Sequence, residues 1–492
     1  MTIRNGLIAL IAIAVALITV AVMRALPAAS GPPAALPDVV IDDAVTAAAV
    51  SRLSQAIQIQ TISWGNARDK NAADPDGPFA ELHAFLERAY PGVHRALERE
   101  TVNGASLIYR WKGANDALAP IALAAHLDVV PIEAGTEEGW PAPPFSGAVR
   151  DGVIWGRGAL DDKGSVIALM EAAERLIAKG FAPSRDIYFL FGHDEELGGA
   201  RGAGAIIEKL EADGVRLAWT LDEGSAPVTG VIPGFDGVIA LISLAEKGST
   251  TLKLTASAEG GHSSTPSQEM AAAILAEALV KLADNPHPYV IDKNVEAFLH
   301  AIAPYTPFTQ RLALKNLWLF GGIVKSTLAS DPVTAATLHT TTAITIISAG
   351  TKTNILPQQA EAFVNYRIHP RDTPESVKER AAALINDERV AMTVVGANPA
   401  SPVSSREADG YGQIESAIRQ TFGDIVIAPS LTLQGTDQRH YAKISDDAYR
   451  FFPFVVTPED LSRIHGSNER ITVENFARGI AFYEALIEGG AQ

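Results

Sequence analysis

The sequence predicts an α/β fold in which a doubly wound sheet carries helices on both faces and a second, α+β domain is inserted. Three observations predict it. Apolar strands alternate with amphipathic helices from about Asp42, polar and apolar residues alternate after Lys247, and strand and helix signals return from Pro399. A chain of 492 residues is also too long for one compact core, so more than one domain is expected.

The first half of the chain alternates helices with continuously apolar strands. Helices are predicted over 43–59, 81–90, 161–180 and 199–214, and strands over 106–113, 120–130, 216–224 and the start of 186–196. Gly180 supplies a stop for the third of these helices. Because strands that are apolar throughout are buried on both faces, the pattern indicates a mainly parallel sheet between two helical layers.

The segment after Lys247 has a different character. Strands are predicted over 249–260, 340–348, 360–369 and 390–396, and helices over 267–284 and 373–387. Thr373 is the expected N-cap of the last helix. Alternating strands with one wet face are typical of an antiparallel sheet, so this segment is predicted to be a separate domain. A final helix is predicted over 472–489.

The N-terminus carries an apolar run. Gly6 to Met23 is 18 residues without a charge, flanked by Arg4 and Arg24, and a Pro/Ala linker follows to Pro37. The run is just long enough to span a bilayer and long for the core of a signal peptide. We expect an exported protein held by this signal anchor, with cleavage to a secreted or periplasmic form as the alternative.

Composition excludes some functions. The net charge is −17, with no block of Lys or Arg, so a nucleic-acid partner is not expected. There is no cysteine, so the fold has no disulfide and a metal site must use His, Asp and Glu.

Histidines and acids directly follow apolar segments at five places. They are His126 with Asp128, Asp161 with Asp162, His193 to Glu196, Asp222 with Glu223, and His465. Ligands bind at the carboxyl ends of strands in open α/β sheets. Strands that start near Ile121, Ile187 and Arg216 are therefore expected to bring His126, Glu195/Glu196 and Asp222 into one crevice. Clustered carboxylates repel one another unless a divalent metal neutralises them. Taken singly, each place has a plainer interpretation: a structural His, a solvated acidic loop or a helix cap.

Six motifs occur in order: H-x-D in "HLDVVP", G-R-G-x-x-D-x-K-G in "GRGALDDKG", D-E-E-x-G-G in "DEELGG", D-E-G in "LDEG", G-H-S-S in "GGHSSTP" and H-G in "RIHGSNE". By this set, the chain from about Val45 resembles the co-catalytic zinc aminoacylase/carboxypeptidase family, which includes acetylornithine deacetylase, aminoacylase and carboxypeptidase S. Residues 340–370 and "LQGTDQRHY" are similar to the branch of carboxypeptidase S and the secreted N-fatty-acyl-amino-acid synthase/hydrolase.

The resemblance implies a domain organisation. It predicts a zinc-peptidase-like, doubly wound mixed sheet formed by residues 41–246 and 399–492. It also predicts an inserted lid or dimerisation domain with an antiparallel sheet, residues 247–398, after an N-terminal segment of residues 1–40. A homodimer is compatible with such an insert.

The resemblance also implies two zinc ions per chain, whose ligand set suits cobalt or manganese as well. His126, Asp161 and Asp222 match the ligands of one ion. Asp161, Glu196 and His465 match those of the other, so Asp161 bridges the pair. Metals bridged in this way hold a hydroxide that attacks the carbonyl.

Two more acids have implied roles beside the metals. Glu195 resembles the general base, which returns the proton of the water to the leaving amine. Asp128 resembles the carboxylate that fixes the tautomer and angle of His126. The Asp161–Asp162 peptide is expected to be cis, whereas His193 has no family role and is interpreted as structural or as supporting the site.

Further matches concern the substrate. His262 resembles the residue that stabilises the oxyanion, across a dimer or after domain closure. Asn354 and Arg367 match positions that bind a substrate carboxylate or the transition state, and Gly435 and Thr436 match a substrate-contacting loop. Gln434 and Gln438 depart from the residues common in the family, Gly and Ser, and leave the substrate pocket less defined than the metal chemistry.

The function predicted from these residues is hydrolysis of the amide bond of N-acyl amino acids by a dinuclear zinc enzyme, with the reverse condensation also open. A carboxypeptidase acting on di- or short peptides is the alternative hypothesis, and a non-catalytic metal-binding protein is a third. The apolar stretch Phe298–Leu328, which has no acids, is expected either to line a channel for long acyl groups or to form the insert's own core or a dimer interface.

Overall fold

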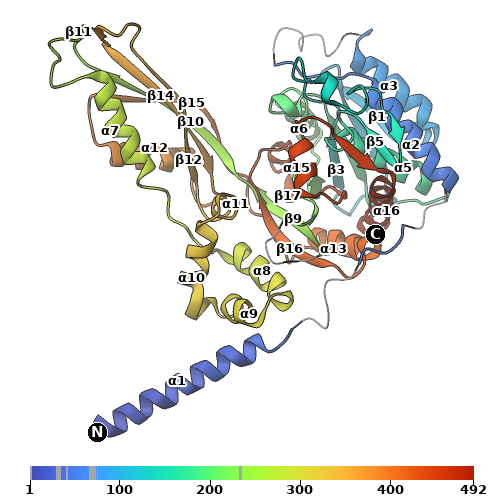
Figure 1. Cartoon of the computed structure of the whole chain (residues 1–492). Coiled ribbons are helices and arrows are strands. Elements are labelled where there is room, and N and C mark those ends of the chain that lie inside the picture. Colours follow the sequence, from blue (N-terminus) through green and yellow to red (C-terminus); the bar gives the residue numbers. More distant parts are fainter. Residues whose placement is uncertain are drawn as a thin grey trace.

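The structure is a computed structural model that describes residues 3–28, 35–39, 43–65, 74, 76–231, 235 and 237–491. Residues 29–34 of the predicted linker lie outside the described residues. Figure 1 shows a large α/β body, an arm that reaches away from it, a group of short helices below the arm, and the N-terminal helix projecting from that group.

The α/β body is built on a nine-stranded sheet, which confirms the predicted mixed α/β fold. Along the sheet the strands are β1 (Glu98–Val102), β2 (Ser106–Trp111), β6 (Ile187–Gly192), β3 (Ile121–His126), β7 (Leu217–Asp222), β17 (Ser445–Arg450), β9 (Val238–Glu246) and β16 (Val426–Thr432), with β8 (Pro227–Thr229) beside β9. The central strands β6, β3, β7 and β17 are parallel, and β1 and β2 extend one side as antiparallel strands.

Helices cover both faces of this sheet because successive residues of a strand point to opposite sides. Leu123 and Ala125 of β3 face the larger core, and Ala122 and Ala124 face the smaller one. The larger core includes α2 (Asp43–Gln58), α3 (Pro78–Ala89), α4 (Pro91–Ala96), α5 (Lys163–Ala178), α13 (Asp409–Phe422) and α16 (Val473–Gly490). The smaller includes α6 (Ala203–Ala212) and α14 (Gln438–Tyr441).

A small antiparallel sheet joins two loops that are distant in the sequence. Its strands are β18 (Arg470–Thr472), β5 (Val153–Trp155) and β4 (Val149–Arg150), and Arg470 pairs with Trp155. Helix α15 (Pro458–Arg463) comes shortly before β18, and α5 follows shortly after β5. The loops after Trp155 and before Arg470 are therefore held side by side.

The arm is an antiparallel sheet in the order β12 (Thr341–Ala349), β14 (Gln359–Ile368), β10 (Gly248–Ser257) and β15 (Val390–Asn398). Helices α7 (Ala271–Ala283) and α12 (Pro374–Ile385) pack on one face and form a second core. Thr373 is the N-cap of α12, as predicted. At the tip, β11 (Gly261–His262) pairs with β13 (Ile355–Leu356).

The apolar stretch Phe298–Leu328 folds into helices. The group consists of α8 (Lys293–Ile302), α9 (Phe308–Leu314), α10 (Leu317–Ala329) and α11 (Pro332–Ala336). Leu299, Ile302 and Val324 belong to the core of the α/β body and not to the core of the arm. The group packs beside β16, away from the β11 tip of the arm (Figure 1).

Helix α1 (Ile3–Ala25) follows the predicted apolar run. Its window Ile8–Ala25 has a mean hydropathy of 2.5 and is long enough to cross a membrane by length and composition.

Candidate active site

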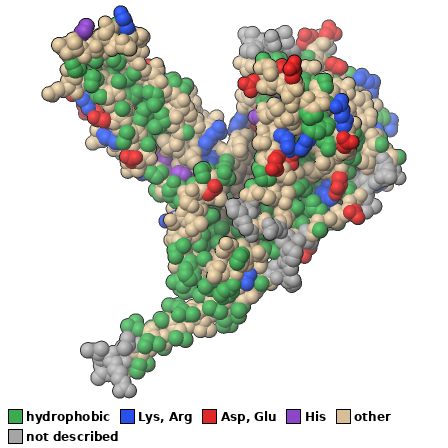
Figure 2. Space-filling view, in the orientation of Figure 1, with side chains coloured by type: hydrophobic (Ala, Val, Ile, Leu, Met, Phe, Trp, Pro, Cys, Tyr) green, Lys and Arg blue, Asp and Glu red, His purple; other side chains and the backbone are tan. Residues whose placement is uncertain are grey.

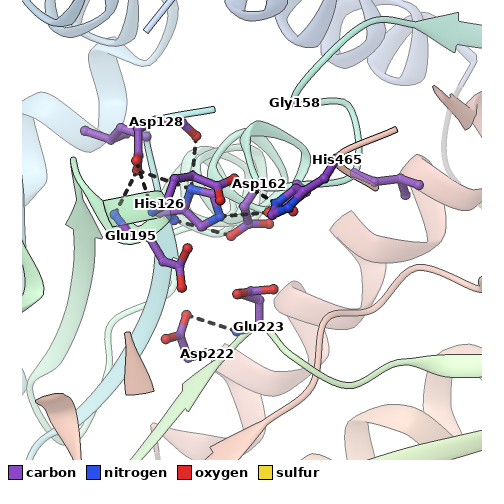
Figure 3. Close-up of polar contacts among 12 residues, drawn as sticks. His126, Asp128, Gly158, Asp162, Glu195, Asp222, Glu223 and His465 are labelled. Atoms are coloured by element: carbon purple, nitrogen blue, oxygen red, sulfur yellow. Dashed lines mark hydrogen bonds and ion pairs between the residues drawn. The ribbon is translucent and has the colours of Figure 1, made fainter. Parts of the chain in front are cut away.

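Three neighbouring strands bring the predicted site residues to one edge of the sheet. β3 is parallel to β6 on one side and to β7 on the other, so their carboxyl ends lie together. β3 ends at His126 and β7 at Asp222, and β6 is followed by a short 3₁₀ turn, Glu195–Leu197. Figure 3 shows His126, Glu195, Asp222 and Glu223 around this edge.

His126 is held at both ring nitrogens. Nδ1 is 3.0 Å from the carbonyl oxygen of Asp128 and 3.4 Å from its Oδ1. Nε2 is 2.8 Å from Oδ1 of Asp161. Burial lowers the pKa of His126, but the contacts with the two carboxylates outweigh burial and raise that pKa well above its ordinary value.

Asp161 lies between two imidazole rings. Its Oδ1 contacts His126, and its Oδ2 is 3.1 Å from Nε2 of His465. The Asp161–Asp162 peptide is cis, as expected. The two oxygens of this carboxylate thus face two different histidines, which is the arrangement that a bridging metal ligand needs.

His465 and Glu196 complete this side of the cluster. Oε1 of Glu196 is 3.1 Å from Nε2 of His465. Hydrogen bonds to Asp161 and Glu196 raise the pKa of His465 to about 10. His465 also has φ of 60°, a left-handed conformation that is uncommon outside glycine and that concentrates at functional sites.

An ion pair that the sequence analysis did not single out joins the loops of Asp161 and His465. Arg157 donates to Oε2 of Glu469 at 2.7 Å and to the carbonyl of Gly466 at 2.8 Å. Oε1 of Glu469 accepts the backbone N–H groups of Gly158, Leu160 and Asp161 at 3.0, 2.9 and 3.1 Å. Arg157 and Glu469 both lie within motifs quoted above, but no local feature of the sequence indicates that the two residues form an ion pair.

The other side of the cluster contains three acids. Ligand atoms of His126, Glu195 and Glu223 lie within 4.8 Å of one another. Asp222 is in neither group of ligand atoms: its Oδ1 accepts the N–H of Glu223 at 2.9 Å, and its buried Oδ2 has no hydrogen-bond partner among the described residues. Glu223, to which the sequence analysis gave no role, thus lies among these ligand atoms, and Asp222, the predicted ligand, keeps one buried oxygen free of hydrogen bonds within the described part of the chain.

These acids share a buried environment that is short of positive charge. Burial raises the pKa of Glu195 and of Glu223 well above the ordinary value, and neighbouring carboxylates add to the effect. Burial also raises the pKa of Asp222 to about 6. No described Lys or Arg forms an ion pair with Glu195, Glu196 or Glu223.

The donor set fits a divalent metal centre. Ligand atoms of His126, Asp161 and Glu196 also lie within 4.8 Å of one another, so His126 belongs to both groups. Imidazole nitrogens with carboxylate oxygens are ligands that zinc accepts, and a cation would stabilise carboxylates whose pKa values are raised by burial first and by neighbouring carboxylates second.

Asp128 contacts both His126 and the turn that contains Glu195 and Glu196. It is fully buried and accepts the hydroxyl of Ser63 at 2.7 Å. Its Oδ1 accepts the N–H of Glu195 at 3.1 Å, and its Oδ2 accepts the N–H of Glu196 at 3.2 Å. The side chain that contacts His126 thus also positions the turn with the two glutamates.

Three predicted substrate residues lie on the arm. His262 is exposed at the β11 tip, where its Nδ1 is 2.7 Å from the hydroxyl of Ser264. The carbonyl of Asn354 accepts the N–H of Ser263 at 3.2 Å, so Asn354 lies beside His262. Arg367 is exposed on β14. His262 belongs to neither group of ligand atoms around His126 among the described residues.

Two other predicted residues are on the loop after β16. Thr436 is buried and donates to Oε2 of Glu246 at 2.7 Å, and Glu246 pairs with Arg450 at 3.0 Å. Gly435 is half-buried next to Arg439.

Two residues without an assigned family role have structural contacts. Nε2 of Gln438 donates to Thr220 and to the carbonyl of Tyr449. His193 contacts the hydroxyl of Ser106 at 2.7 Å and packs edge-on against Phe79, as expected of a structural residue.

A family model described as "Peptidase family M20/M25/M40" matches residues 122–489. This chain belongs to the M20 family. The match extends over most of the chain and includes all the residues of the cluster, so the metallohydrolase predicted from the motifs is confirmed at the level of the family.

Several curated M20 relatives match nearly the whole chain. "Probable carboxypeptidase S-like 2" of Dictyostelium discoideum is 39% identical over 89% of this chain and 84% of its own length. "N-fatty-acyl-amino acid synthase/hydrolase PM20D1" of Homo sapiens is 38% identical over 89% of this chain and 86% of its own length. "Carboxypeptidase S" of Saccharomyces cerevisiae is 29% identical over 89% of this chain and 84% of its own length.

Solved structures show the same fold at low sequence identity. The M20 family metallo-carboxypeptidase of Sulfolobus solfataricus has a TM-score of 0.63 at 16% identity, with 91% of this chain and 99% of that chain covered. Human carnosine dipeptidase 1 has a TM-score of 0.58 at 16% identity, with 92% and 97% covered.

Proposed function

We propose that this M20 hydrolase uses two zinc ions to cleave the amide bond of N-acyl amino acids. The observation that carries the proposal is the position of Asp161, whose two oxygens face His126 and His465. A carboxylate with a different imidazole at each oxygen is suited to bridging two ions.

The residues that would hold the metals come from four segments. One ion would be held by His126, Asp161 and an acid of the Asp222–Glu223 pair, and the other by Asp161, Glu196 and His465. Two such ions would lower the pKa of a water, so that it would lose its proton readily and become a nucleophile, and would polarise the carbonyl of the substrate. Cobalt or manganese would fit the same donors.

Glu195 would move the proton. Its carboxylate is close to His126 and Glu223 but, unlike Glu196, makes no hydrogen bond with an imidazole in the described part of the chain. Burial raises the pKa of Glu195, and a raised pKa makes a carboxylate a stronger base. Glu195 would accept the proton of the water and pass it to the leaving amine.

The arm would supply the groups that recognise the substrate. We expect His262 to stabilise the oxyanion and Asn354 and Arg367 to bind the carboxylate of the amino acid, since a guanidinium makes two parallel hydrogen bonds to a carboxylate. Gly435 and Thr436 would shape the pocket from the catalytic side. Because His262 and Asn354 lie at the tip of the arm, they would act after the arm closes or from a second copy of the chain.

The names of the relatives support an N-acyl amino acid as substrate. Five of the similar proteins, from fish, frog, mouse, human and cattle, carry the name N-fatty-acyl-amino acid synthase/hydrolase. A second candidate, cleavage of di- or short peptides, is favoured by the relatives named carboxypeptidase S and carboxypeptidase S-like. Both reactions hydrolyse an amide next to a free carboxylate.

A panel of matched substrates separates the two functions. The kcat/KM of the zinc-loaded enzyme would be measured for N-acetyl, N-long-chain-acyl and dipeptide forms of one amino acid. We expect the N-acyl forms to be hydrolysed faster than the dipeptide. Faster hydrolysis of the dipeptide would favour the carboxypeptidase, and turnover of none of the three would contradict both.

A further test concerns the location of the enzyme. We propose that α1 is a signal anchor and that the α/β body works on the exported side of the membrane. Mass spectrometry of the mature protein would decide: a peptide from residues 8–25 is expected, and a mature N-terminus after Arg24 would instead indicate cleavage.

A further inference from the structure

An apolar surface on helices α9 and α10 lies next to the base of helix α1. We call it the α9–α10 surface. Its members are exposed apolar side chains, namely Phe308 (43% exposed), Trp318 (51%), Leu319 (49%) and Ile323 (67%). Figure 2 shows hydrophobic side chains gathered over this part of the molecule and continuing along α1.

Hydrogen bonds fix this group of helices to α1. Nε of Arg311 donates to the carbonyl of Ala25 at 2.7 Å, and Nδ2 of Asn316 donates to the carbonyl of Ala21 at 2.9 Å. The last four carbonyls of a helix lack intrahelical partners, so Arg311 caps the end of α1 at Ala25, and Asn316 adds a contact one turn earlier, at Ala21. Asn316 is fully buried in this contact. A bilayer that contains α1 would therefore meet the α9–α10 surface as well.

The exposed side chains of helix α10 are apolar in its first half and polar in its second half. Trp318, Leu319 and Ile323 are exposed in its first two turns, which follow the contact of Asn316 with α1. Lys325 and Ser326 are exposed further along, and Ser330 follows the last turn. The apolar half is thus the half near α1. Val324 on the opposite face packs into the core of the α/β body, so the exposed residues are not needed for that packing.

The charges of this segment suit a lipid surface. Residues 298–328 include no Asp or Glu, in a chain whose net charge is −17. Of their three basic residues, Lys325 is exposed, whereas Arg311 and Lys315 are half-buried and donate to backbone carbonyls. Basic residues at the membrane surface are attracted to anionic headgroups, and tryptophan concentrates at the boundary between headgroups and acyl chains. An acidic protein that has no acid in this stretch, and that exposes Phe308 and Trp318 beside its apolar helix, has the composition of a membrane contact there.

We propose that the α9–α10 surface lies in the interfacial region of a lipid bilayer, with Trp318, Leu319 and Ile323 among the acyl chains and α1 crossing the bilayer beside them. The protein is thereby held at the membrane by two contacts, α1 and the α9–α10 surface. The partner is a bilayer with anionic headgroups. This inference concerns attachment and does not depend on which amide the enzyme hydrolyses.

The absence of cysteine makes a clean labelling experiment available. Single-cysteine variants of the full chain, Ile323→Cys, Leu10→Cys and Val280→Cys, would carry a nitroxide spin label. Leu10 lies in α1 and is 65% exposed, and Val280 lies on α7 of the arm and is 57% exposed. The labelled proteins would be reconstituted in vesicles of phosphatidylcholine with phosphatidylglycerol. Collisions with oxygen, which partitions into lipid, would be compared with collisions with a water-soluble nickel chelate.

We expect the labels at positions 323 and 10 to be protected from nickel and reached by oxygen, and the label at 280 to show the reverse. A label at 323 that nickel reaches as readily as at 280 would overturn the proposal, as would nickel access to position 10. Dipolar coupling between 323 labels without oxygen access would also overturn it, because a second copy would then cover the surface. Leu319→Cys provides a second site if the first variant unfolds, which circular dichroism and the unfolding temperature would report.

Discussion

The carboxylate of Asp128 accepts the backbone N–H of Glu195 at 3.1 Å. The same side chain accepts the N–H of Glu196 at 3.2 Å, and its Oδ1 is 3.4 Å from Nδ1 of His126. A residue that follows one strand thus sets the position of a turn that follows the neighbouring strand. This contact connects a predicted metal ligand to the predicted base.

Asp128→Asn should therefore disturb two parts of the site at once. The amide keeps one acceptor oxygen but presents an N–H₂ group to a backbone N–H, so the His126 ring and the glutamate turn both loosen. We expect activity and metal affinity to fall by about 10- to 100-fold. Kinetics and competitive metal titration would measure this, with Asp446→Asn as a control because Asp446 pairs with Arg216 on the exposed surface. Equal losses in the two variants would contradict the prediction.

Glu195→Gln should separate catalysis from metal binding. An amide cannot accept the proton of the water, so kcat should fall by about 100- to 10,000-fold. Metal content should be preserved. Glu196→Gln is the matched variant: it removes a carboxylate that contacts His465 and should lose metal. Turnover close to that of the unaltered enzyme in Glu195→Gln would disprove the assignment of the base.

Breaking the Arg157–Glu469 pair should destabilise the protein and weaken the metal centre. Both side chains are buried, with 2% and 0% exposure, so removing one leaves an unpaired charge inside the protein. We expect Arg157→Leu to cost about 3–5 kcal/mol of unfolding free energy.

Glu469→Gln is the informative partner of that variant. It retains an oxygen for the three N–H groups of the Asp161 loop but loses the charge that pairs with Arg157. Denaturant unfolding and elemental analysis would be run on both. Unchanged stability and metal content in Arg157→Leu would show that the two loops are held by other contacts.

Metal binding should release protons near neutral pH. In the metal-free protein, hydrogen bonds to Asp161 and Glu196 raise the pKa of His465 to about 10, so the ring is protonated below that pH. A metal ligand must be a neutral imidazole, so binding displaces this proton, and affinity should rise with pH toward about 10. Calorimetry in buffers of different ionisation enthalpy would count the protons. His465→Ala should release about one fewer, and equal release would show that His465 is not a ligand.

The sequence predicts the fold and the position of the site because both depend on local patterns. Continuous apolar strands indicate a buried parallel sheet, and His126 and Asp222 stand where those strands end. The choice between Asp222 and Glu223 is harder, since adjacent residues differ only in side-chain length and direction. In the structure, the backbone N–H of Glu223 donates to Oδ1 of Asp222. The carboxylate of Glu223, on the longer side chain, lies among the ligand atoms of His126 and Glu195.

Contacts between distant segments were not predictable. Arg157 and Glu469 are 312 residues apart in the sequence, and they meet because β5 pairs with β18. The stretch Phe298–Leu328 is apolar enough for either a channel or a core, and composition does not say which. In the structure, its buried side joins the core of the α/β body. That contact is made between segments that are distant in the sequence, so no local pattern predicts it.

Anomalous diffraction from crystals grown with zinc tests the central claim most directly. If Asp161 bridges two ions, data at the zinc absorption edge should show two peaks per chain, one beside His126 and the other beside Glu196 and His465. The same map would show whether Asp222 or Glu223 contacts the first ion, and Asp161→Ala crystals should lose both peaks. A single peak in the unaltered protein, or two peaks that persist in Asp161→Ala, would contradict a dinuclear centre bridged by Asp161.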